Sequence, residues 1–84
     1  MRIIYILRSK KDARLYIGST NNLNKRISQH NAGEVPSTKG RRPFELIYCE
    51  IYKSSEDAFH REHNLKLQSN ALYQLKKRLK KSLN

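Results

Sequence analysis

The sequence has few cysteines, few acidic residues and no long apolar run, and each shortage excludes a class of protein. Cys49 is the only cysteine, so the chain cannot form an intrachain disulfide or a cysteine-based zinc site. The longest apolar run of the amino-terminal segment, Ile3 to Leu7, is too short for a signal-peptide core or a membrane span. We therefore expect a cytoplasmic protein that is not inserted in a membrane.

The charge of the chain is strongly one-sided. Eighteen Lys and Arg residues stand against seven Asp and Glu residues, which gives a formal net charge of +11 over 84 residues. A compact body with this charge attracts polyanions, and nucleic acid is the default partner because phosphate neutralisation releases counterions. A membrane surface or ribosomal RNA would satisfy the same charge, and composition alone does not choose among them. The length predicts a single domain over residues 1–84 with a modest core.

The apolar pattern near the amino terminus predicts a β-hairpin. The run Ile3 to Leu7 is typical of a strand buried on both faces, and Leu15 to Ile17 of a second short strand. The polar segment between them is short, which favours an antiparallel pairing. One plausible register places Tyr5 and Tyr16 on the same face as diagonal neighbours.

A third strand is predicted from Phe44 to Tyr52 by its alternating apolar residues. Ile47, Cys49 and Ile51 fall on one face of this strand, so we expect Cys49 to be a buried thiol. The predicted fold class is therefore α+β, with a three-stranded antiparallel sheet flanked by about three helices.

Start signals and apolar spacing predict the helices at residues 23–30, 55–67 and about 70–82. Asn21 or Asn22 can cap the first helix, and Ser54 stands at capping-box spacing before the second. Ser69 can cap the last helix, whose outer face is basic. No linker divides the chain into two domains.

Glu62 is the most informative residue of the second predicted helix. Ala58, Phe59 and Leu65 define the inner stripe of this helix, and Glu62 falls on the same stripe. A carboxylate that points inward is unfavourable unless it is paired or binds a metal ion. A salt bridge to one of the many cations is the alternative explanation.

Four other residues could carry chemistry. Arg26 and His30 lie four residues apart on one helix face, where they could contact a phosphate or relay a proton. The alternative is a solvated polar face. Tyr5 and Tyr16 could act on a proton only near a strong cation or metal ion, since a phenol has an ordinary pKa of about 10. The alternative for them is a core aromatic pair.

Two basic segments are candidates for nucleic-acid contact. The first is the loop over residues 37–43, and the second is the outer face of the last helix. Contacts of this kind position a nucleic-acid backbone without reading its sequence. The alternatives are a solvated loop and a helix that docks another protein. The candidate residues are Lys39, Arg41, Arg42, Lys76, Lys77 and Arg78.

Taken together, these residues resemble the GIY-YIG nuclease superfamily, especially its small single-domain members similar to the nuclease module of bacterial excision repair. The segment 3–5, Ile-Ile-Tyr, resembles the first half of the family signature, with Ile3 in place of its glycine, and the segment 16–18, Tyr-Ile-Gly, matches the second half. Arg26 matches the phosphate-binding arginine of the family, and Glu62 matches its metal-binding glutamate. Gln74 is the nearest equivalent of a late asparagine found in some members.

The resemblance implies a metal-dependent endonuclease that hydrolyses DNA phosphodiester bonds, structure-selective and linked to DNA repair or recombination. Glu62 would be the only protein ligand of a Mg²⁺ or Mn²⁺ ion, and Tyr16 would take the proton from the attacking water. Tyr5 would orient that water or the phosphate, Arg26 would stabilise the transition-state charge, and His30 would assist. RNA is a second candidate substrate. The alternatives are a non-catalytic nucleic-acid-binding module on the same fold and a subunit that depends on a partner protein.

Overall fold

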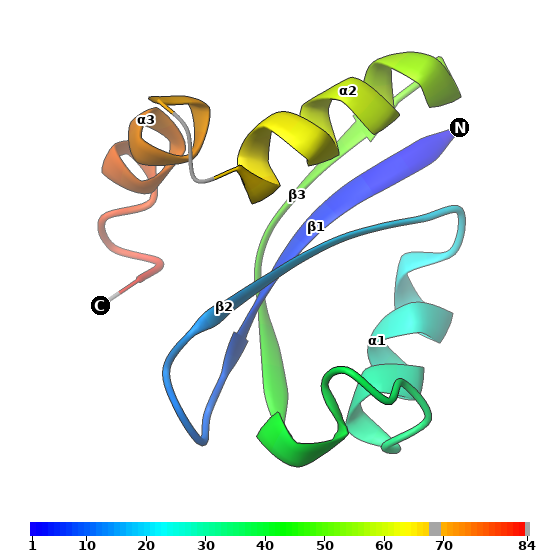
Figure 1. Cartoon of the computed structure of the whole chain (residues 1–84), viewed down its shortest axis with the longest axis vertical. Helices are drawn as coiled ribbons and strands as arrows, with labels where there is room; N and C mark the ends of the chain where they lie inside the picture. Colours follow the sequence, from blue (N-terminus) through cyan, green and yellow to red (C-terminus); the bar gives the residue numbers. More distant parts are fainter. Residues whose placement is uncertain (68–69, 84) are drawn as a thin grey trace.

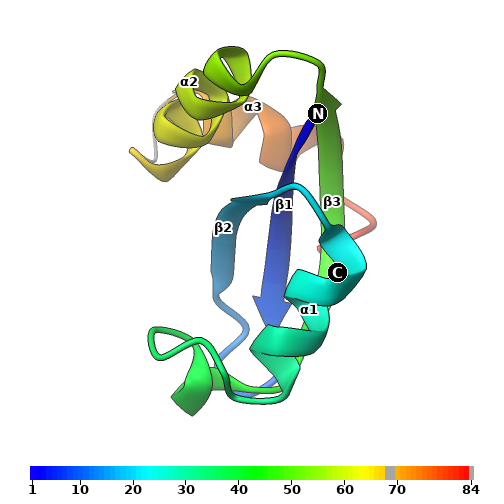
Figure 2. The same ribbon diagram turned by 90° about the vertical axis from the view of Figure 1, so that its right-hand side faces the viewer.

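An antiparallel sheet of three strands forms the middle layer of the protein, and helices cover both of its faces (Figures 1 and 2). The computed structural model describes residues 1–67 and 70–83. Its elements are β1 (Arg2–Ser9), β2 (Leu15–Thr20), α1 (Leu23–Asn31), the 3₁₀ turn η1 (Lys39–Arg41), β3 (Phe44–Tyr52), α2 (Ser55–Lys66) and α3 (Asn70–Arg78). The predicted α+β class with three antiparallel strands and three helices is confirmed.

The central strand β1 pairs with β2 on one side and with β3 on the other, so β2 and β3 are both edge strands. Tyr5 is the partner of Gly18 in β2, and Leu7 is the partner of Tyr16. Tyr5 and Tyr16 are therefore diagonal neighbours on one face, in the register that the sequence analysis considered plausible.

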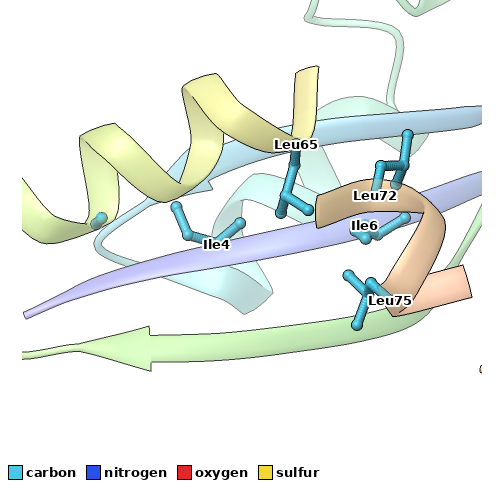
Figure 3. Close-up of a cluster of buried hydrophobic side chains, with 6 residues drawn as sticks. Ile4, Ile6, Leu65, Leu72 and Leu75 are labelled. Atoms are coloured by element: carbon cyan, nitrogen blue, oxygen red, sulfur yellow. The ribbon is translucent and has the colours of Figure 1, made fainter. Parts of the chain in front are cut away.

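The first face of the sheet packs against α2 and α3. Ile4 and Ile6 of β1 contact Leu65, Leu72 and Leu75 there, and these five side chains form the centre of the larger core (Figure 3). Burial of such aliphatic side chains is the main favourable contribution to folding. The core of this small domain is thus built by α2 and α3 together.

The second face of the sheet packs against α1, which lies on the opposite side from α3 (Figure 2). Tyr5, Leu7 and Phe44 are buried there, and Leu23 and Ile27 of α1 pack against them. Because both faces of β1 are covered, its side chains from position 4 to position 7 are all buried, which confirms the prediction for this strand except at Ile3, which is half-buried.

The helix starts follow the predicted capping signals where the structure describes them. The Asn22 side chain accepts a hydrogen bond from the Lys25 amide, and Ser54 accepts one from the Asp57 amide. The predicted cap at Ser69 lies outside the described residues. Within the described chain, no helix has the length and apolarity needed to cross a bilayer.

The prediction that Cys49 is buried is wrong, because its side chain is exposed. The pairing of β1 with β3 shifts between Ile6 and Leu7, which leaves one extra residue in β3 at this point. The shift resets the alternation along β3, so Cys49 faces the same side as its partner Tyr5. On that side α1 packs at the Phe44 end of the strand, and the later part of β3 is open, with Ile51 62% exposed.

Candidate active site

The Tyr5 ring lies across Gly18 of the neighbouring strand. A Cβ atom at position 18 would lie 2.4 Å from both Cζ and Oη of Tyr5, a distance that no real pair of atoms tolerates. The Tyr5 side chain is almost fully buried, with a relative exposure of 1%. Gly18 is thus the residue that lets the phenol reach from the central strand across β2.

The hydroxyl of Tyr5 is tied to a buried histidine in α1. Tyr5 Oη lies 2.9 Å from His30 Nε2, and His30 Nδ1 lies 2.8 Å from Thr38 Oγ1. Thr38 donates its own proton to the Val35 carbonyl at 3.4 Å, so Thr38 Oγ1 accepts from the Nδ1 hydrogen of His30. A neutral His30 then accepts at Nε2, which makes Tyr5 the donor.

The surroundings of His30 favour this neutral form. Burial lowers the pKa of His30, and the charge of Arg26 lowers it further. The sequence analysis expected His30 to assist at the site, and the structure places it behind Tyr5, with no exposed surface. It contacts the rings of Tyr5 and Tyr16 rather than the open surface, so any effect on the reaction passes through these two tyrosines.

Tyr16 and Arg26 lie beside Tyr5 in this cluster. The ring centroid of Tyr16 is 6.3 Å from that of Tyr5 and 4.9 Å from that of His30. Burial raises the pKa of Tyr5, and Arg26 lies close enough to the hydroxyl to oppose this effect through hydrogen bonding and charge. The structure therefore brings together four residues that the sequence singled out from three different elements.

Glu62 approaches the same cluster from α2. Ala58 and Leu65 are fully buried, as predicted, and the Glu62 side chain is only 20% exposed. Its charge acts to raise the pKa of Tyr5, so the carboxylate lies within electrostatic range of the phenol. The prediction that Phe59 lies on the inner stripe is wrong, since this ring is 63% exposed. The buried face of α2 is narrower than the periodicity suggested.

A second carboxylate fixes the helix that carries Glu62. Glu50 in β3 accepts hydrogen bonds from Arg61 Nε at 2.6 Å, from Tyr48 at 2.6 Å and from Tyr52 at 2.9 Å. Burial acts to raise the pKa of Glu50, but these donors outweigh it and the pKa is lowered. The hydrogen bond between Tyr48 and Glu50 is the main reason that the pKa of Tyr48 is raised to about 12.

The hydrogen bonds of Glu50 also orient α2. Arg61 directly precedes Glu62 in this helix, so the bond from Arg61 to Glu50 sets the rotation of α2. Sequence reasoning missed it, because it took the face of β3 that carries Cys49 as the buried one, and Glu50 lies on the opposite face.

The donor set suits a hard divalent ion held mainly by water. Within the described residues, no three His, Cys, Asp or Glu side chains lie together as a metal cluster. Glu62 offers a carboxylate, the ligand type that Mg²⁺ prefers, and a Mg²⁺ site commonly keeps several waters. Its partner in the structure is Lys66, at 2.7 Å from Oε2, with a lysine side chain that is 51% exposed. Lys66 is the exposed partner of this pair, and ion pairs with an exposed partner four residues apart on a helix contribute little, so a cation can displace Lys66.

Of the candidate residues in the loop, Arg41 has a structural role. Its guanidinium pairs with Asp12 at 2.8 Å and lies 5.6 Å from the centroid of the Phe44 ring. The Arg41 hydrogen bond lowers the pKa of Asp12 to about 2. Lys39 and Arg42 are exposed, and Arg42 donates to the Lys39 carbonyl. Two of the three loop cations are therefore open to a ligand.

The three candidate residues of α3 lie in different surroundings. Lys76 lines a groove of about 420 Å³ along β2, whereas Lys77 lies 5.4 Å from the centroid of the Tyr73 ring. Arg78 lines a separate pocket together with Arg61. The residues that line the first cavity, named here the β2 groove, are Arg14, Leu15, Tyr16, Ile17, Lys66, Leu72 and Lys76.

A smaller polar pocket borders the other end of β2. Its volume is about 250 Å³, and Arg26 lines it together with Arg2 and Lys25. Tyr16 and Arg26 thus each belong to the active-site cluster and to one of two flanking cavities. Sequence reasoning missed Arg2, Arg14, Lys25 and Lys66, because in a chain with 18 cations no local pattern distinguishes these four.

Comparison with known proteins shows which families of domains this chain is similar to. The GIY-YIG catalytic domain model matches residues 1–81. A UPF0213 protein of Clostridium perfringens is 45% identical over 67 residues, which cover 79% of this chain and 71% of the relative. A UPF0213 protein of Natronomonas pharaonis is 42% identical, over 81% of this chain and 80% of the relative. The solution NMR structure of a UPF0213 protein from Bacillus halodurans matches 95% of this chain and 86% of its own, with 33% identity and a TM-score of 0.58.

Proposed function

The chain belongs to the GIY-YIG family of nuclease domains, and on this premise we propose that it is a divalent-metal-dependent endonuclease that hydrolyses DNA phosphodiester bonds. The proposed substrates are structured intermediates of DNA repair or recombination, and RNA is the second candidate. The observation that carries the proposal is the convergence of Tyr5, Tyr16 and Arg26 at the edge of β2, within electrostatic range of Glu62. A nuclease needs a proton acceptor, a cation for the phosphate and a metal ligand in one place.

The two tyrosines have different roles in this proposal. Tyr5 is buried, and its hydroxyl donates a hydrogen bond to Nε2 of the neutral His30, so the lone pairs of its oxygen can orient a water molecule. Tyr16 is half-buried and borders the β2 groove, where a substrate phosphate has access. Tyr16 is therefore the residue that takes the proton from the attacking water, and Tyr5 positions this water for attack.

Arg26 and Glu62 have roles in compensating the negative charge of the substrate phosphate. The Arg26 guanidinium is a planar donor that suits the equatorial oxygens of a phosphate under attack, and it sits beside both the cluster and the polar pocket. Glu62 would hold the Mg²⁺ or Mn²⁺ ion, which when bound neutralises the phosphate and the leaving oxygen. The protein supplies the proton acceptor, the orientation and the guanidinium, and the ion supplies the remaining positive charge.

A cleavage panel tests the proposal. Plasmid, flap, single-stranded DNA and single-stranded RNA substrates are incubated with wild-type protein and with Glu62→Gln, with and without Mg²⁺ or Mn²⁺. Wild-type protein is expected to cut at least one DNA substrate only when the ion is added. Glu62→Gln is expected to lose roughly 100-fold or more in rate while it still binds DNA, a typical effect for a group that stabilises transition-state charge.

A matched control is available on the same helix. Glu56 is an exposed glutamate in the first turn of α2, so Glu56→Gln removes the same charge away from the cluster and is expected to leave cleavage unchanged. Equal cleavage by wild type and Glu62→Gln would refute the assignment of the metal ligand. Binding without cleavage of any substrate would instead identify the chain as a non-catalytic nucleic-acid-binding module.

A further inference from the structure

The β2 groove lies directly beside the proposed active site, because Tyr16 is part of both. Its cations come from three separate segments: Arg14 precedes β2, Lys66 ends α2 and Lys76 lies in α3. The seven described residues that line the groove include no acidic side chain. The three cations lie around one cavity, and within the described chain only Lys66 among them pairs with a carboxylate, that of Glu62, so an anion in the groove would reduce the repulsion among them.

We propose that the β2 groove binds a backbone phosphate that neighbours the cleaved one, so that the nucleic-acid strand runs along the free edge of β2. This inference rests on the proposed function for the position of the cleaved phosphate. Two features of the groove fit a nucleotide unit. The cations can bind the phosphate through charge-assisted hydrogen bonds, and Leu15, Ile17 and Leu72 give an apolar wall for the attached sugar.

Lys66 links the groove to the metal ligand. It lines the groove and also pairs with Glu62 at 2.7 Å, so one ammonium group is shared by the two sites. A phosphate in the groove competes with Glu62 for this lysine, and the pair is exposed enough to exchange. Occupation of the groove therefore releases Glu62 from Lys66 at the moment when the strand is in place.

Single substitutions separate the groove from the general positive charge of the protein. Lys76→Gln removes one groove cation from an exposed position, so the fold should be unaffected. Lys53→Gln is the matched control, because Lys53 is also exposed but lies in the turn before α2 and lines none of the groove. Binding of a short, fluorescently labelled oligothymidylate is measured at several salt concentrations.

Lys76→Gln is expected to weaken this binding roughly five- to tenfold, the effect of one charge-assisted contact. It should also reduce the slope of log K against log salt by roughly 0.7, as expected for one single-strand phosphate contact. Lys53→Gln is expected to change the affinity and the salt slope by only a small fraction of the changes caused by Lys76→Gln. An equal effect of Lys53→Gln would overturn the inference, since it would show diffuse attraction instead of a built subsite.

Chemical-shift mapping of the wild-type protein gives a second test that needs no variant. Added oligothymidylate should shift the amide resonances of Leu15, Ile17 and Leu72, which surround the groove. Shifts confined to the loop over residues 37–43 would refute the subsite. The proposed function is judged separately, since the absence of cleavage refutes the nuclease and leaves the binding result to decide about the groove.

Discussion

The substitution Gly18→Ala tests how tightly the active site is packed, because the added methyl group meets the Tyr5 ring at 2.4 Å. With 1% exposure, this ring cannot move aside into solvent. Overpacking of this kind costs about 1–3 kcal/mol. Displacement of the ring also breaks the hydrogen bond to buried His30, and an unsatisfied buried group costs about 1–3 kcal/mol. We therefore expect a loss of about 2–6 kcal/mol in the free energy of unfolding.

The assay is urea unfolding of Gly18→Ala beside Gly40→Ala. A Cβ at position 40 meets no atom within 4 Å, so this control is expected to be neutral or to stabilise by about 0.4–1 kcal/mol. For a domain of this size, the loss at position 18 corresponds to a decrease in Tm of at least about 8 °C. Equal unfolding midpoints for the two variants would refute the claim that the close packing of Tyr5 on Gly18 stabilises the site.

Two further predictions concern pH. Burial, and then the charge of Arg26, lower the pKa of His30 below its ordinary 6.5. The imidazole therefore binds a proton more readily in the unfolded chain than in the folded protein. The stability of the fold should accordingly fall as the pH drops below 6.5. Urea midpoints measured from about pH 8 to about pH 5 should show this fall, and His30→Gln should flatten it. The lowered pKa of Glu50 stabilises the fold above its ordinary value of 4.5, and this contribution is lost as the pH falls through the folded-state pKa. Glu50→Gln should thus cost about 1–2 kcal/mol near neutral pH, after partial screening by solvent, and much less in acid, as urea unfolding would show.

Much of the fold was predictable because its signals are local. The bounds of β3 and the cap at Ser54 follow from strand alternation and capping chemistry within a few residues. The diagonal placement of Tyr5 and Tyr16 corresponds to one plausible register of the short hairpin, although the sequence alone does not select it. Helix periodicity singled out Arg26 and Glu62 as candidate residues, and the resemblance to the family then gave them roles.

The rest depends on contacts between distant segments, which no local pattern contains. The shift in pairing at Ile6 and Leu7 is set by two strands together, and it decides that Cys49 is exposed. The bond between His30 and Thr38 depends on how the loop folds back on α1. The β2 groove likewise requires α3 to pack beside β2, which brings Lys76 near Tyr16 although they are far apart in sequence.

Paramagnetic relaxation by Mn²⁺ tests most directly whether Glu62 binds a divalent ion beside Tyr5 and Tyr16. The measurement needs no substrate, since Mn²⁺ broadens the amide resonances of residues close to it. Selective broadening at Tyr16 and Gly18 is expected in wild type and in Glu56→Gln, and its loss is expected in Glu62→Gln. Equal broadening in all three proteins, or broadening that leaves Tyr16 and Gly18 untouched, would contradict a metal-assisted active site at the edge of β2.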